Sequence, residues 1–265
     1  MVSKKKALAV LGVALLIAFA AVILTAHFRH NRRPLLIFSG AGMKTPLLEL
    51  IANFTDSTGV PVDVHFEGSS ILRQYVETYG DADLMLSGDL GNIDLMEKKG
   101  LVRKKNFVAW HVPAILVPAG NVARIQGLKD LSKKGVRVVM SNPGQASLGR
   151  LVRDMLLRQA IGRAVLRNVV AYGSSSQDDL RLFQELYKQG KADAVIEWDV
   201  MAHAPEGEGL IAIPFEKEYE IKDALTIALL TTSRDPGTAI RFYDYFRSKG
   251  SPVFKKHGYA IEVLR

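Results

Sequence analysis

The chain has 265 residues, of which 48% are hydrophobic and 23% charged, which suits one or two globular domains with a sizeable core. It has no cysteine, which excludes disulfides, thiolate metal sites, a cysteine nucleophile and a lipoprotein anchor. The formal net charge is +8, but residues 1–33 hold six Lys and Arg and no acid. Removing those six from 35 leaves 29 basic against 27 acidic residues, or +2. No nucleic-acid partner is expected, because that requires a basic surface on the folded domain itself.

Residues 1–33 have the pattern of a targeting segment. Lys4, Lys5 and Lys6 precede an uncharged apolar run over residues 7–26, which is long enough for a membrane span. The basic start and the small residues Ala18 and Ala20 are typical of a signal peptide. Two interpretations stay open: a cleaved signal peptide, or an uncleaved signal anchor with the body outside. Either one predicts a periplasmic or extracytoplasmic body, and contact with the membrane only through this segment.

From Pro34 onward, short apolar runs alternate with amphipathic segments. In chain order we predict strand 35–38, helix 45–58, strand 60–66, helix 71–79, strand 83–86, helix 92–99, strands 115–117 and 136–140, helix 147–160, strand 168–172, helix 177–189, strands 194–196 and 225–230, and helix 237–249.

The alternation of strand, loop and helix indicates an α/β fold with mainly parallel sheets flanked by helices. No internal repeat and no long linker interrupts it, so two lobes that share crossing strands are expected. We assign residues 34–117 plus 223–265 to lobe I and residues 118–222 to lobe II.

Gly- and Ser-rich loops follow the predicted strands, where open α/β sheets bind ligands. They contain no Lys or Arg, and several lead into helix N-termini, whose free N–H groups favour an anion. Each loop alone reads more simply as a turn or a helix cap. Together they predict a cage for a small oxyanion. The loops are residues 39–42, 68–70, 142–149, 174–176 and 197–198.

Enzymatic activity is not expected. The sequence has no Gly-x-Ser-x-Gly elbow, no nucleotide-binding P-loop and no His-Glu-x-x-His motif. Its six histidines are scattered, which suits surface or core positions better than catalysis. No cofactor is expected either.

Several segments, in this order, resemble the molybdate/tungstate-binding periplasmic proteins of ABC importers. Ile37 to Gly42 is similar to that family's first strand and ligand loop, and Ala82 to Asp89 to its strand ending in Ser-Ala-Asp. The resemblance covers about residues 35–263 and implies a two-lobe type 2 periplasmic-binding-protein fold. It also includes the segments 54–64, 68–70, 192–194, 242–246 and 254–259.

The resemblance further implies which residues hold a dehydrated tetrahedral oxyanion through neutral donors. The ligand-binding positions it implies are Ser39, Ala41, Gly42, Ser69, Ser70, Leu148, Leu180 and Trp198. Gly42 departs from the family by replacing a serine, and Trp198 by replacing a tyrosine. Glu197 aligns with a glutamate through which tungstate-type relatives contact the metal of the bound anion.

The leading hypothesis is therefore a monomeric binding protein that captures molybdate or tungstate for an ABC transporter permease. A membrane-tethered sensor or interaction module that uses the same cleft is the alternative. Sulfate or phosphate as the bound anion also remains open.

Overall fold

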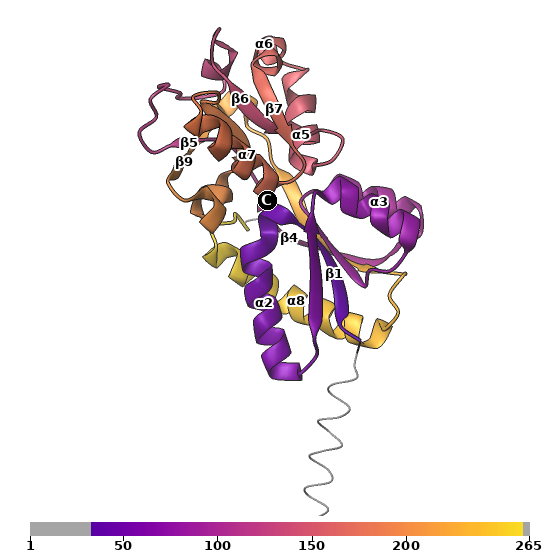
Figure 1. The fold of residues 1–265 in the computed structure, drawn as a ribbon. Helices are drawn as coiled ribbons and strands as arrows, with labels where there is room; N and C mark the ends of the chain where they lie inside the picture. The colour runs from indigo at the N-terminus through magenta and orange to yellow at the C-terminus, as the bar shows by residue number, and fades with distance from the viewer. Residues whose placement is uncertain (1–32, 262–265) are drawn as a thin grey trace, which may run out of the picture.

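The computed structural model describes residues 33–261 as two lobes, each built on one five-stranded sheet with helices packed against it (Figure 1). The apolar run at residues 7–26, on which both interpretations of the targeting segment rest, lies outside the described residues. Within residues 33–261, no helix is long and apolar enough to cross a membrane.

The first sheet has the strand order β2-β1-β3-β10-β4. β1 pairs in parallel with β2 and β3, whereas β10 runs antiparallel to β3 and β4. Helices α2 and α8 lie side by side on this lobe, and α3 and α4 also contact each other (Figure 1). The elements are β1 Leu35–Gly40, η1 Ala41–Met43, α2 Lys44–Thr58, β2 Val62–Glu67, α3 Ser69–Tyr79, β3 Leu84–Ser87, α4 Leu90–Lys98, β4 Val102–His111, β10 Asp223–Leu230 and α8 Pro236–Lys256.

The second sheet has the order β7-β6-β8-β5-β9 and repeats this plan. β6 pairs in parallel with β7 and β8, and β5 runs antiparallel to β8 and β9. The elements are β5 Pro113–Pro118, η2 Asp130–Ser132, β6 Val138–Ser141, α5 Ser147–Leu156, α6 Gly162–Arg167, β7 Val169–Gly173, α7 Ser176–Lys188, β8 Ala194–Trp198, η3 Asp199–His203, η4 Pro205–Gly207, β9 Leu210–Pro214 and η5 Lys217–Tyr219.

The chain crosses between the lobes twice, at Val112 and again after η5. Because β5 pairs only within the second sheet, residues 113–117 lie in the second lobe, although we predicted them in the first. β10 begins at Asp223 and returns the chain to the first sheet.

The two-lobe α/β architecture is confirmed, but both sheets are mixed, not mainly parallel. The antiparallel pairs are those of β10 with β3 and β4 and those of β5 with β8 and β9, and the edge strands β4 and β9 were not predicted from the sequence pattern. β4 carries the exposed run Arg103 to Lys105, and β9 has exposed residues at both Ile211 and Ala212. The charged run therefore hides β4 from the sequence pattern, whereas β9 has only a four-residue apolar run, Leu210 to Ile213, which by itself is an ambiguous strand signal.

Candidate functional site

A small cavity lies between the two lobes, at the ends of strands from both sheets. It offers about 20 Å³ to the centre of a water-sized sphere, and residues of both lobes line it. Among the described residues its lining includes one carboxylate side chain, that of Glu67, and no Lys or Arg. The lining consists of Gly40, Ala41, Gly42, Met43, Glu67, Gly68, Ser69, Gly88, His111, Ser141, Ala146, Ser147, Leu148, Ser175, Ser176 and Trp198.

Ser69 occupies the first position of α3 in the first lobe and is buried. Gly68 caps this helix without a side-chain hydrogen bond, so the first N–H groups of α3 are not used by the helix itself. The Gly88 N–H donates to Ser69 Oγ across 3.1 Å. Because that hydroxyl oxygen already accepts, its own O–H is free to donate to a ligand in the cavity.

The second lobe presents two more helix starts to the cavity. α5 begins at Ser147 and Leu148, again with no side-chain cap. α7 is capped by Ser175, whose hydroxyl accepts from the Asp178 N–H. The partial positive charge at these helix N-termini favours an anion between them.

Gly42 lines the cavity and is contacted by residues that are distant in the sequence. Its carbonyl accepts a hydrogen bond from Tyr259 Oη at 2.5 Å. A Cβ added at Gly42 would lie 3.0 Å from Trp198 Cδ1 and 3.2 Å from Ser176 Oγ. The absence of a side chain at Gly42 therefore lets the first lobe approach the second this closely.

His111 and Trp198 form one wall, with their rings stacked. His111 Nδ1 lies 3.0 Å from the Gly88 carbonyl oxygen, which fixes the proton on Nδ1. Burial lowers the pKa of His111 to about 4, so the ring is neutral at pH 7. Its Nε2 then carries a lone pair and has no hydrogen-bond partner among residues 33–261.

Two buried carboxyl groups, Asp179 and Glu197, stand behind the serines of the second lobe. Ser141 donates to Asp179 Oδ2, and Ser176 Oγ donates to Glu197 Oε1 at 3.0 Å. Burial raises the pKa of both groups, and the Glu197 pKa is raised further by the charge of Asp179. Among the described residues no other group donates to Asp179 Oδ1 or Glu197 Oε2, which leaves these two oxygens available to share a proton with each other. At pH 7 two such neighbouring groups are more stable when they share one proton than when both are negatively charged.

The cavity collects some of the predicted ligand-binding residues but not all of them. Ala41, Gly42, Ser69, Leu148 and Trp198 line it. Four others do not. Ser39 donates to the Gly40 carbonyl, Ser70 contacts the second lobe, the Leu180 side chain is in the core, and Glu197 lies behind Ser176. No described group of three or more His, Asp or Glu is placed to hold a metal ion.

Several lining residues are not among the predicted ligand-binding positions. Ser147, Ser175 and Ser176 lie within the loops that we predicted to form the oxyanion cage, and their positions at helix starts could have identified them. His111 gave no such signal, because it ends β4, a strand that the pattern did not predict.

Comparison with known proteins agrees with this architecture. The model of the family described as bacterial extracellular solute-binding protein matches residues 35–260. The molybdate-binding protein ModA of Mycobacterium tuberculosis is 30% identical over 215 residues, which cover 79% of this chain and 77% of that protein.

Two solved structures share the fold. The sulfate-binding protein SubI from Mycobacterium tuberculosis superposes with a TM-score of 0.72 at 19% identity, covering 84% of this chain and 85% of that one. The periplasmic molybdate-binding protein of Azotobacter vinelandii gives 0.68 at 16% identity, covering 86% of this chain and 100% of that one. Since the family model spans nearly all described residues, the chain belongs to the bacterial extracellular solute-binding proteins, which bind solutes and are not enzymes.

Proposed function

We propose that this protein captures a small tetrahedral oxyanion, molybdate or tungstate, in the cavity between its lobes and delivers it to an ABC importer. The observation that carries the proposal is the convergence of α3, α5 and α7, whose N-termini meet at one small cavity lined with serines and glycines. Helix N-termini supply backbone donors and positive potential without a counter-charge.

The hydrogen-bond pattern supports an anion that accepts from several directions. Ser69 has an O–H free to donate, and α3 and α5 begin with unused N–H groups. Neutral donors of this kind favour a fully deprotonated anion, since a ligand O–H would face another donor. His111 Nε2 and the carboxylate of Glu67 are the exceptions in the lining.

Molybdate is favoured by the likeness to the molybdate-binding protein ModA, and tungstate rests on the sequence resemblance alone, while SubI is a sulfate-binding protein with the same fold. Glu197 as a contact to the metal of the anion stays a prediction. Delivery to a permease, the extracytoplasmic location, the monomeric state and the lobe boundaries at 222/223 are likewise part of the proposal.

Calorimetry with molybdate, tungstate, sulfate and phosphate, each added separately to the purified protein, tests the proposal. We expect saturable binding of molybdate or tungstate at one site per chain, with sulfate and phosphate weaker by an order of magnitude or more. Tighter binding of sulfate would reassign the ligand within the oxyanion class. Absence of binding by all four anions contradicts the oxyanion proposal.

A further inference from the structure

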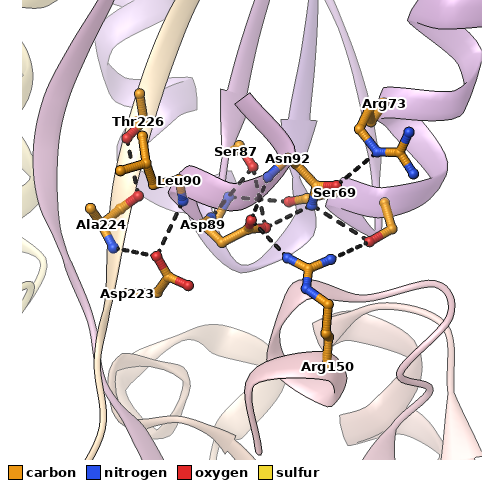
Figure 2. Close-up of polar contacts among 12 residues, drawn as sticks. Ser69, Arg73, Ser87, Asp89, Leu90, Asn92, Arg150, Asp223, Ala224 and Thr226 are labelled. Carbon is orange, nitrogen blue, oxygen red and sulfur yellow. Dashed lines mark hydrogen bonds and ion pairs between the residues drawn. The ribbon is translucent and has the colours of Figure 1, made fainter. Parts of the chain in front are cut away.

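Arg150 reaches from the second lobe to the first without lining the cavity. It lies in the first turn of α5, and its Nη2 contacts Asp89 Oδ1 at 2.8 Å. Its Nη1 donates to Ser70 Oγ at 3.2 Å. Figure 2 shows the guanidinium extended from its helix toward the polar cluster of the opposite lobe.

The first lobe holds the acceptor for Arg150 in a fixed position. Asp89 is 1% exposed and caps α4, with Oδ1 accepting from the Asn92 N–H and Oδ2 from Asn92 Nδ2, each at 2.7 Å (Figure 2). Arg73 Nε donates to Asn92 Oδ1 at 3.0 Å and fixes that side chain in turn. All of these contacts form within the first lobe, so the carboxylate is pre-positioned before the lobes meet.

The lobe faces around this contact are packed closely enough to define a closed conformation. A Cβ at Gly68 would lie 2.5 Å from two backbone carbonyl oxygens of the second lobe, those of Gln145 and Ser174. A Cβ at Gly88 would lie 3.0 Å from Ser147 Oγ. The ion pair of Arg150 and Asp89 therefore belongs to the closed state and separates when the lobes open.

We propose that Arg150 is an inter-lobe latch: its contacts with Asp89 and Ser70 favour the closed form independently of the ligand and slow ligand release. The part that concerns ligand release rests on the proposed function. Arg150 is a positioning residue, because it acts through the open–closed equilibrium and does not touch the cavity. A charge-assisted pair in a partly buried place stabilises the state that contains it.

Arg150→Ala tests the latch, and Arg153→Ala is the matched control. Arg153 lies on the same helix, but its ion pair with Asp154, at 2.9 Å, stays within that helix. Spin labels on the two lobes report the closed fraction of the ligand-free protein by pulsed electron resonance. We expect this fraction to fall in Arg150→Ala and to stay unchanged in Arg153→Ala.

Ligand kinetics give the second readout. With molybdate as the probe, we expect Kd to rise about tenfold in Arg150→Ala, mainly through faster dissociation. Arg150→Lys keeps the charge, so its Kd should lie between those of wild type and Arg150→Ala. This variant takes the place of Arg150→Ala if the alanine variant does not fold.

The latch is overturned if ligand-free wild type and ligand-free Arg150→Ala give identical distance distributions. If the alanine variant does not fold, the same comparison is made between wild type and Arg150→Lys. If molybdate does not bind at all, the proposed function fails, while the ligand-free distances still decide the latch.

Discussion

The imidazole of His111 lies nearly parallel to the indole of Trp198, with ring centroids 4.2 Å apart and an interplanar angle of 16°. His111 ends β4 in the first lobe, and Trp198 ends β8 in the second. The stack thus joins the two lobes at the wall of the cavity. Aromatic pairs of this geometry stabilise their contact beyond the area they bury.

Trp198→Phe should keep this stack and weaken anion binding about tenfold, because phenylalanine has a ring but no N–H to donate. Calorimetry gives the affinity, and a thermal melt checks that the fold is retained. Trp110→Phe is the control, since Trp110 does not line the cavity. Equal affinity of wild type and Trp198→Phe would show that the indole N–H does not contact the ligand.

Ser69→Ala should weaken anion binding by about 1.5–3 kcal/mol, since a charge-assisted hydrogen bond from its free hydroxyl would be lost. Ser39→Ala is a matched control, because Ser39 is also buried but donates to the Gly40 carbonyl. Titration calorimetry of both variants makes the comparison. If Ser39→Ala is the more damaging change, the anion lies nearer β1 than the cavity lining indicates.

Gly68→Ala should hinder closure, because its Cβ would meet the carbonyl oxygens of Gln145 and Ser174 at 2.5 Å. We expect affinity to fall by about 1–3 kcal/mol. The melting temperature without ligand should change little, since opening the lobes relieves the clash. Gly120→Ala is the control, because nothing lies within 4 Å of a Cβ there. Small-angle scattering with ligand should show Gly68→Ala more extended than wild type, and an equally compact variant would refute this account.

Asp223→Asn should remove a pH dependence of stability. Burial, and then the charge of Asp89, raise the Asp223 pKa from 3.8 to about 6. The native state therefore binds the proton of Asp223 more tightly than the unfolded state does. The stability that this proton contributes is lost as pH rises from about 4 to about 6. Asparagine can still accept from the Leu90 and Ala224 N–H groups.

Relative to wild type, Asp223→Asn should gain about 2–3 kcal/mol of unfolding free energy between pH 4 and pH 7. Urea unfolding at several pH values measures the difference, with exposed Asp56→Asn as control. A constant difference across this range would mean that the carboxyl group has the same pKa in both states.

The sequence pattern predicted the parallel β-loop-α units well, because each combines a buried strand with an amphipathic helix. β1 with α2 and β6 with α5 are examples, and their buried residues follow the expected periods. β4 was missed because Lys104 and Lys105 lie on an exposed edge, where no apolar alternation is required.

The cavity lining was predictable where a lining residue lies at a helix start, as at Ser69 and Leu148. The lining was not predictable where the direction of a side chain determines whether the residue faces the cavity. Ser69 and Ser70 are neighbours, yet one lines the cavity and the other contacts Arg150. His111 reaches the site through strand pairing between β4 and β10, a long-range relationship that local sequence does not show.

The hydrogen bond from Tyr259 to the Gly42 carbonyl connects positions 217 residues apart. Trp110 also pairs with Ala260, so the segment after α8 supports both the Gly42 loop and the end of β4. During synthesis the N-terminal part of a chain emerges first. The Gly42 loop then lacks the hydrogen bond from Tyr259 until residue 259 has emerged, so this part of the cavity is completed only late in synthesis.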